Sequence, residues 1–257
     1  MIDKVAFVAL LTIVRKEILR IAQSWAQTLL PPVITSALYF GIFGYILGNR
    51  FGVISGFDYI QYIAPGLIMI AIINIAYSSV SGSYFISKFQ RAADELIIAP
   101  ITADIVLWGH ILGGLTHSFV VGILVLIITF LFVHMAIAHV FFMLLIFFLS
   151  GVMFSLSGFI NALLAKKFND IMFIPTFILT PLMYLGGVFY NVNMLPTIWY
   201  KISLFNPIFY LINAFRFAMI GYSEVNLWVT LAIILSFIVI LYAIAIYMLR
   251  NRIGVRF

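Results

Sequence analysis

The sequence predicts an all-α membrane protein with six transmembrane helices. Three observations support this fold class: 65% of the 257 residues are hydrophobic, the mean hydropathy is +1.21, and long segments without Asp, Glu, Lys or Arg recur along the chain. About half of the residues in a soluble globular domain are apolar, whereas a helix that crosses a hydrocarbon core of about 30 Å needs about 20 apolar residues. The composition is therefore that of a protein embedded in lipid.

The segments without charged residues give the number of spans. Four of them, between residues 20–50, 58–88, 170–201 and 224–250, hold 25 to 30 residues each, which is enough for one spanning helix. The fifth lies between Asp104 and Lys166 and holds 61 residues, so it has room for two helices with a turn near residues 133–139. Six spans follow, in a single transmembrane domain over residues 1–257. We expect it to consist of an interfacial helix at 1–25, a six-span region at 26–249 and a tail at 250–257.

The distribution of basic residues predicts the orientation in the membrane. Eleven of the 14 Lys and Arg residues fall in the N-terminal segment, the 85–104 loop, the loop at Lys166–Lys167 and the tail, which all lie on one side of a six-span chain. Cytoplasmic segments carry an excess of Lys and Arg, so both termini are predicted to be cytoplasmic. The net charge of +6 forms no continuous basic stripe, and we therefore expect the lipid bilayer, and no nucleic acid, as a partner.

Residues 1–25 predict an uncleaved amphipathic helix on the cytoplasmic membrane surface. Polar residues recur at spacings of three and four, which places them on one helix face: Thr12, Lys16, Arg20, Gln23 and Gln27. The apolar run 5–14 has the length of a signal-peptide core, but charged residues follow it and no small-residue cleavage motif is present. A surface helix is favoured, with a retained signal as the alternative.

Missing motifs exclude several classes of function. The sequence contains no cysteine, no GxxxxGK[ST] phosphate loop and no HExxH zinc motif. We therefore expect no catalytic residues, no metal and no cofactor bound by this chain, and no enzymatic activity of its own. No span carries a charged residue near its centre, which argues against an ion-coupled carrier. His110 and His117 lie seven residues apart on one helix face and could in principle ligate haem, but packed histidines are the favoured interpretation.

The segment 206–217, NPIFYLINAFRF, gives the strongest local signal. It begins with Asn-Pro, and these residue types suit the N-cap and the first helical position. Gly221 suits the end of this helix. Together with the apolar stretch 179–188, the segment predicts a re-entrant helical hairpin on the outer side, between spans 5 and 6. Arg216 either pairs with Glu224 or extends to the outer headgroups.

Small residues at helical spacing predict close helix contacts. In lipid, such residues let two helix backbones approach each other closely. Gly109 and Gly113 form one such pair, and Gly151 and Gly158 lie on another helix. Packing within one subunit is favoured over a subunit interface.

The segment 89–100, FQRAADELIIAP, is a short charged stretch between apolar spans, in a chain with only 9% charged residues. Arg91 and Glu95 lie four residues apart and share a helix face. Residues 96–98 are apolar, and Pro100 ends the helix. The pattern favours a helix that docks on a partner, and a solvated turn is the alternative.

The region after residue 178 resembles the signature of the ABC-2 type permeases. The matching residues are Leu179, Leu182, Leu185, Gly186, Val188, Leu195, Pro196, Pro207, Ile208, Tyr210 and Arg216. The six spans, the charged first cytoplasmic loop and the outer hairpin extend the resemblance to the whole chain. Within that family the chain resembles the short, single-domain bacterial inner-membrane permeases of the YadH and NodJ kind, in the segments 27–40, 87–100 and 177–190.

This resemblance implies a function. The chain is expected to be the membrane-spanning permease subunit of an ATP-binding cassette exporter in a bacterial inner membrane. A separate ATPase subunit, present in two copies, would bind ATP and Mg and dock on the first cytoplasmic loop. The docking residues are then Phe89, Gln90, Arg91, Asp94, Glu95, Leu96 and Pro100, and the signature residues of the outer hairpin are Leu179, Gly186, Pro196, Asn206, Pro207, Tyr210 and Arg216.

A homodimer with the transport pathway at its two-fold interface is expected as well. Drugs, lipids and glycans are not distinguished as substrates. The alternative function is a stand-alone channel or secondary carrier for a small amphiphile.

Overall fold

The computed structural model describes residues 2–47, 52–90 and 101–254. Within these residues, six helical segments are long and apolar enough to cross a membrane: Trp25–Gly44, Tyr59–Phe89, Ala103–Phe132, Val140–Leu164, Phe168–Leu185 and Leu227–Arg250. The predicted all-α fold with six candidate spans is therefore confirmed. Strands are limited to one short hairpin in this part of the chain, β1 (Val53–Ile54) and β2 (Phe57–Asp58), in which Val53 pairs with Asp58.

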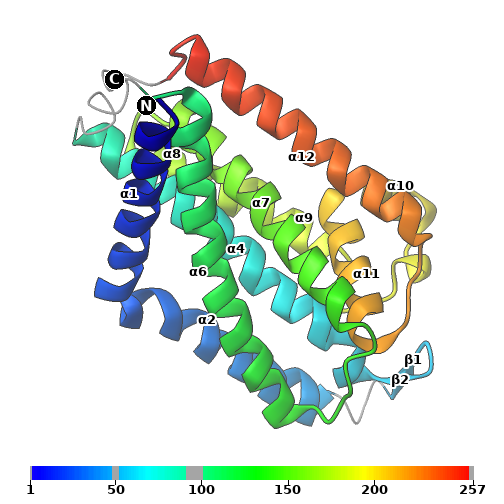
Figure 1. The fold of residues 1–257 in the computed structure, drawn as a ribbon. Helices are drawn as coiled ribbons and strands as arrows, with labels where there is room; N and C mark the ends of the chain where they lie inside the picture. Colours follow the sequence, from blue (N-terminus) through cyan, green and yellow to red (C-terminus); the bar gives the residue numbers. More distant parts are fainter. Residues whose placement is uncertain (1, 48–51, 91–100, 255–257) are drawn as a thin grey trace.

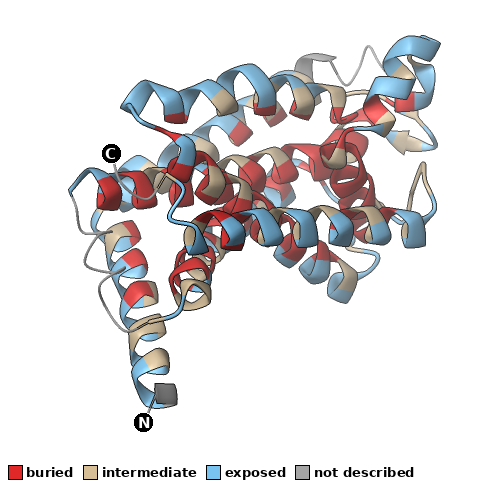
Figure 2. Ribbon diagram, turned by 90° about the horizontal axis from the view of Figure 1, so that it is seen from above, coloured by how far each residue is buried: buried red, intermediate tan, exposed pale blue. Residues whose placement is uncertain are grey.

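The chain starts with two helices joined by a tight turn. Helix α1 (Ile2–Gln23) ends two residues before the predicted boundary, and after Ser24 the chain turns into α2 (Trp25–Tyr39). Helix α2 contains Pro31 and Pro32 and continues as the π-helix η1 (Phe40–Leu47). In Figures 1 and 2, α1 runs across the bundle, whereas α2 runs along it.

The centre of the bundle is α4 (Tyr59–Phe89), which is buried along most of its length. Helices α6 (Ala103–Phe132) and α7 (Val140–Leu164) pack on it, and residues 133–139 connect them, where the sequence predicts a turn. Figure 2 shows the buried residues concentrated on these helices and on α11. A helix that is apolar all round and buried in a bundle is surrounded by other helices rather than by lipid.

The fifth span is interrupted. It consists of α8 (Phe168–Ile174), the π-helix η2 (Pro175–Leu179) and α9 (Thr180–Leu185). Proline lacks the backbone N–H that an α-helix needs, so Pro175 and Pro181 account for the change of helix type. The last span, α12 (Leu227–Arg250), packs on α7 and α11 but keeps many apolar side chains exposed, as expected for a helix that contacts lipid.

Between α9 and α12, the chain forms η3 (Val192–Met194), α10 (Thr197–Leu204) and α11 (Pro207–Ile220). Helices α10 and α11 meet at 83°, and α11 is buried against α4, α7 and α12. The segment therefore bends sharply at the predicted hairpin, and its re-entry into a membrane remains a prediction. The start of α1 and the end of α12 lie at the same end of the bundle (Figure 1).

Candidate functional site

The predicted docking segment begins where the central helix α4 ends. Phe89 is the last residue of α4 and is 70% exposed, and Gln90 caps the helix. The other predicted docking residues, Arg91, Asp94, Glu95, Leu96 and Pro100, lie outside the residues that the structure describes. The structure thus places only the base of the docking segment, on the helix that contacts most of the bundle.

Next to this base, the buried side chain of Lys88 joins α4 to α7. The Lys88 Nζ donates hydrogen bonds to the backbone carbonyls of Leu163, at 2.9 Å, and Ala165, at 2.8 Å. The last carbonyls of a helix have no partner within that helix, and a positive charge there also complements the helix dipole. Gly254 packs against the same Leu163 carbonyl with a φ of +70°. Lys88 therefore fixes the end of α4 to the end of α7.

A hollow of about 390 Å³ lies beside this junction. The loop between α7 and α8 forms part of its wall, and the backbone N–H groups of Lys166 and Lys167 in this loop both donate to Asp170 at 2.9 Å. An apolar hollow with two cations at its edge suits the docking of an apolar side chain next to an acidic one. The described lining residues are Phe85, Ile86, Phe89, Lys166, Lys167 and Phe168.

A buried polar network holds α1 to the bundle. Glu17 is 2% exposed, accepts a hydrogen bond from Ser83 on α4 and pairs with Arg20, whose Nη2 lies 2.9 Å from the carboxylate. The same Nη2 lies 3.0 Å from the Ser79 hydroxyl, which is also 3.0 Å from His117 Nδ1 on α6. His110, two turns earlier on α6, is buried against Tyr84 and contacts the Val106 carbonyl. Within the described residues, no group of His, Asp and Glu could hold a metal ion.

The glycines predicted to pack helices all lie at close contacts within the chain. A Cβ at Gly109 would be 2.6 Å from Ile13, and one at Gly113 would be 2.6 Å from Glu17, so this pair is where α1 crosses α6. A Cβ at Gly158 would be 2.3 Å from the Tyr77 carbonyl of α4. Gly151 faces Leu115 of α6 in the same way.

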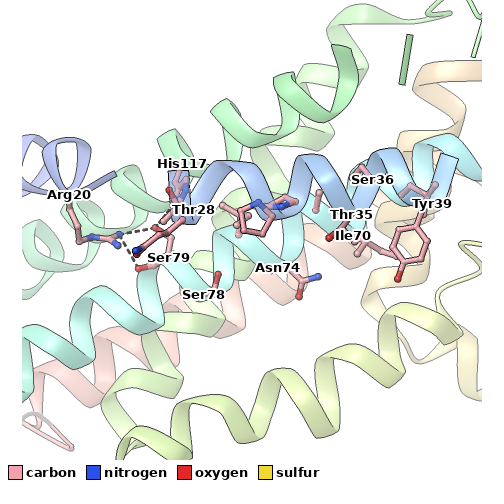
Figure 3. Close-up of a pocket in the computed structure, with 16 residues that line it drawn as sticks. Arg20, Thr28, Thr35, Ser36, Tyr39, Ile70, Asn74, Ser78, Ser79 and His117 are labelled. Atoms are coloured by element: carbon pink, nitrogen blue, oxygen red, sulfur yellow. Dashed lines mark hydrogen bonds between the residues drawn. The ribbon is translucent and has the colours of Figure 1, made fainter. Parts of the chain in front are cut away.

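A pocket of about 410 Å³ lies between α2 and α4 (Figure 3). Figure 3 shows Arg20, Ser79 and His117 at one end of it and Tyr39 at the other. Its walls combine apolar side chains with hydroxyl and amide groups, a mixture that suits an amphiphilic ligand. The polar lining residues between the two ends are Gln27, Thr28, Thr35, Ser36, Asn74 and Ser78.

The predicted hairpin is held together by a buried ion pair. Arg216 is 1% exposed and its Nη1 lies 3.3 Å from Glu224, so it forms the ion pair and does not extend to the headgroups. Its Nη2 donates to the Gly187 carbonyl at 2.6 Å, and its guanidinium lies 4.0 Å from the ring centre of Tyr62 on α4. The Tyr62 hydroxyl donates to the same Glu224 carboxylate.

The remaining signature residues shape the turns around this pair. The Asn206 side chain caps α11 by accepting from the Ile208 N–H at 3.0 Å, and it donates to the Leu182 carbonyl at 2.6 Å. The Tyr210 hydroxyl donates to the Leu204 carbonyl at 2.8 Å. Gly186 lies against Ile212, since a Cβ there would be 2.8 Å from it. Leu179 is buried, Pro196 caps the start of α10, and Pro207 is the first residue of α11.

Comparison with known families identifies this arrangement. The family model described as ABC-2 type transporter matches residues 8–220. The chain belongs to the ABC-2 type transporter family. The match includes most of α1, the first five candidate spans and the bent α10–α11 pair. The ABC-2 resemblance predicted from the signature residues is therefore confirmed, and the chain is a component of a membrane transporter.

Two kinds of relative are similar over most of the chain. The inner membrane transport permease YadH of Escherichia coli strain K12 is 44% identical over 250 residues, which cover 97% of this chain and 98% of that protein. Nodulation protein J of Rhizobium leguminosarum bv. viciae is 21% identical over 207 residues, which cover 80% of each chain. Nodulation protein J of Sinorhizobium fredii strain NGR234 is 22% identical over 214 residues, or 83% of this chain and 81% of that protein.

Several residues of this ABC-2 chain that the structure brings together were not identified from the sequence. In the sequence, Lys88 is only a charge at the end of a span, and Glu17 is only part of a charged cluster after an apolar run. The contact between Tyr62 and Arg216 could not be predicted, because the two residues are 154 positions apart and nothing in an apolar span distinguishes this tyrosine from the others. The sequence contains one indication that Glu17 is buried, because it lies off the polar stripe of its own helix. In the structure, that face of the helix packs against α6.

Proposed function

We propose that this chain is the membrane-spanning subunit of an exporter in a bacterial inner membrane, driven by a separate ATP-binding subunit. The observation that carries the proposal is the position of the 89–100 segment. It continues directly from α4, the helix at the centre of the bundle, and Lys88 ties the end of α4 to α7 just before the segment begins. The names of the similar proteins, inner membrane transport permease among them, support the same function.

The position of the segment suits the transmission of force. A partner that moved residues 89–100 would act on α4 without an intervening flexible stretch, because α4 is a continuous helix up to Phe89. Helices α6, α7 and α11 all pack on α4, and closely packed interiors transmit strain because they are hard to compress. A displacement at the docking segment would therefore reach the pocket between α2 and α4 and the hairpin around Arg216.

The second cytoplasmic loop supports the same docking surface. The hollow beside Lys88 presents three phenylalanine rings, from Phe85, Phe89 and Phe168, and the cations of Lys166 and Lys167. We propose that the ATP-binding subunit contacts both loops, with ATP and Mg bound only in that subunit. ATP-driven closure of two such subunits would then shift the spans between two states, because a ligand shifts such an equilibrium by binding one state more tightly.

We further propose a homodimer with the transport path at its two-fold interface. Several spans keep large apolar side chains exposed; among them, α2 exposes Ile34, the fifth span exposes Phe177, and α12 exposes Val239. Lipid or a second copy of the chain can cover such surfaces. The pocket between α2 and α4 would open toward this interface, and its mixture of hydroxyl, amide and apolar groups suits an amphiphile. The substrate itself is not assigned.

Reconstitution tests the proposed function. The purified chain in liposomes is expected to hydrolyse no ATP and to transport none of a panel of lipids, glycans and drugs. Addition of the ATP-binding subunit is expected to produce ATP-dependent transport of at least one of them. Transport by the chain alone would contradict the proposal and favour a channel or secondary carrier.

A further inference from the structure

A third, larger hollow lies between α1 and the end of α4 and is not part of the proposed transport path. Its volume is about 680 Å³. Among the described residues, it is lined by three cations (Arg15, Lys16 and Arg20), by hydroxyl and amide groups, and by Leu19 and Ile86. No Asp or Glu lines it within that part of the chain. The hollow is therefore basic, with an apolar portion at its wall.

Within the described residues, two of the three cations of this hollow are not neutralised. Glu17 is the nearest described carboxylate, but its oxygens are held by Arg20 and Ser83, and the side chain is 2% exposed. Arg20 is thus compensated, whereas Arg15 and Lys16 are exposed and form no ion pair within the described residues. Lys16 is oriented along α4 by its hydrogen bond to the Ser87 hydroxyl, at 3.2 Å. In the part of the chain that the structure describes, these two cations are therefore available to an anion.

The surroundings of the hollow indicate where that anion would come from. One to two turns before Arg15, α1 exposes Phe7, Val8 and Leu11, of which the first two are each 61% exposed. A helix with such a face lies at the headgroup level of a bilayer, with its apolar side chains among the acyl chains. Leu19, which lines the hollow, is 49% exposed as well, so the cations and an acyl-chain surface adjoin each other.

We propose that this hollow binds the headgroup phosphate of an anionic phospholipid from the cytoplasmic leaflet. Arg15 and Lys16 provide the charge, the Ser87 hydroxyl, which accepts from Lys16, has its own proton to donate, and Leu19 and Ile86 contact the acyl chains. Basic pockets between helices on the cytoplasmic side have the chemistry that retains anionic headgroups. The bound lipid would hold α1 against α4. This proposal rests on the predicted orientation of the chain and not on the ATP-binding subunit.

Native mass spectrometry of the purified chain, without any ATP-binding subunit, tests the proposal. The probe is phosphatidylglycerol, and phosphatidylcholine with the same acyl chains is the zwitterionic control. We expect phosphatidylglycerol to bind more tightly, and the double variant Arg15→Gln/Lys16→Gln to weaken its binding by roughly fivefold for each lost cation, about 25-fold in all. Both side chains are exposed, so we expect the variant to fold and to keep an unchanged size-exclusion profile.

A matched control separates the site from general surface charge. The variant Lys166→Gln/Lys167→Gln removes the same charge on the same predicted side but outside the hollow, and it should retain phosphatidylglycerol. The charge-conserving variant Arg15→Lys/Lys16→Arg should retain it as well. Equal weakening by both glutamine variants, or equal binding of the two lipids by the unmodified chain, would overturn the proposal.

Two further experiments distinguish a phospholipid from other ligands of the hollow. Glycerol 3-phosphate should fail to displace phosphatidylglycerol at equal concentration, and displacement would mean that the site binds a soluble phosphate instead. If Arg15→Gln/Lys16→Gln abolishes co-purification of the ATP-binding subunit while leaving lipid binding unchanged, the hollow is a protein-docking surface and the lipid proposal is wrong. Because the lipid assay omits that subunit, failure of the lipid site leaves the proposed transport function untouched.

Discussion

The ammonium group of Lys88 lies 2.9 Å from the backbone carbonyl oxygen of Leu163, which is on another helix and 75 residues later in the chain. It reaches the Ala165 carbonyl at 2.8 Å as well. A lysine is rarely this buried unless its charge is matched by several acceptors. Here it satisfies two buried carbonyls at the end of α7, at the point where α4 passes into the proposed docking segment. We therefore expect the contact to contribute both to the stability of the bundle and to the proposed coupling between the ATP-binding subunit and the spans.

Replacing this lysine should affect both properties. Lys88→Met keeps the aliphatic part of the side chain but leaves two buried carbonyls without their donor, so we expect the free energy of unfolding to fall by about 1–3 kcal/mol. Permease-stimulated ATP hydrolysis should fall further than this loss of stability explains. Thermal unfolding and ATPase assays on the reconstituted complex measure the two effects. Lys201→Met, at an exposed lysine on α10, is the matched control and should change neither.

Charge reversal in the docking segment should weaken the partner's binding and spare the fold. Glu95→Lys removes one member of a charge pair at the proposed contact, which costs about 2–5 kcal/mol when the pair is desolvated, enough to lower the affinity more than tenfold. Leu96→Asp should act similarly, because it places a charge in the apolar part of the contact. Co-purification of the ATP-binding subunit measures both.

The control for these variants is Asp58→Lys. It makes the same change of charge at an exposed residue at the opposite end of α4. Normal co-purification and normal stimulated ATP hydrolysis of Glu95→Lys and Leu96→Asp would mean that residues 89–100 are a solvated turn.

Losing one member of the ion pair in the hairpin should destabilise the protein more than its partner's presence alone can compensate, because the two charges neutralise each other. Arg216→Met leaves the Glu224 carboxylate buried without its cation, and Glu224→Gln leaves the guanidinium without its anion, so each single change should cost about 3–5 kcal/mol. The double variant Arg216→Met/Glu224→Gln should be less destabilised than the sum of the two single variants. Thermal or denaturant unfolding of the four proteins gives the coupling energy. Additive effects would show that the two residues contribute independently.

Two glycines offer a matched test of helix packing. An added methyl group at Gly158 would be 2.3 Å from the Tyr77 carbonyl, whereas one at Gly82 would have nothing within 4 Å. Gly158→Ala should therefore force α4 and α7 apart and destabilise the protein by about 1–3 kcal/mol. Gly82→Ala should be neutral or stabilising by up to about 1 kcal/mol, because alanine favours the helix. Unfolding temperatures compare the two, and equal effects would contradict the close contact between α4 and α7 at Gly158.

Disulfide crosslinking should locate the proposed dimer interface. The chain contains no cysteine, so single cysteines at exposed positions report only contacts between copies. We expect one of Ile34→Cys on α2, Phe177→Cys on η2 and Val239→Cys on α12 to crosslink efficiently, because a residue near a two-fold axis meets its own copy. The other two variants, whose cysteines would face lipid, should remain monomeric on denaturing gels. A monomeric mass for the active complex in native mass spectrometry would exclude the homodimer.

The number and approximate ends of the candidate spans follow from the sequence alone. Charged residues cannot lie within hydrocarbon at low cost, and a span needs about 20 apolar residues, so the gaps between charges already mark the helices. Local chemistry also fixed the ends of α11, since an Asn side chain caps the first turn and Gly221, with a φ of +75°, ends the last. The residues that carry the family resemblance could also be recognised from the sequence, because they lie within one short stretch of the chain.

Which buried polar groups meet depends instead on the tertiary packing. Arg216 had two possible environments in the sequence, and the packing of α11 against α4 placed it on Tyr62 and Glu224. Glu17 and Lys88 found their partners 66 and 75 residues away, on other helices. Such contacts depend on the rotation and depth of each helix in the bundle. An almost uniformly apolar span carries little periodicity from which these two quantities can be derived, whereas a buried charge must have its partner within about 3 Å.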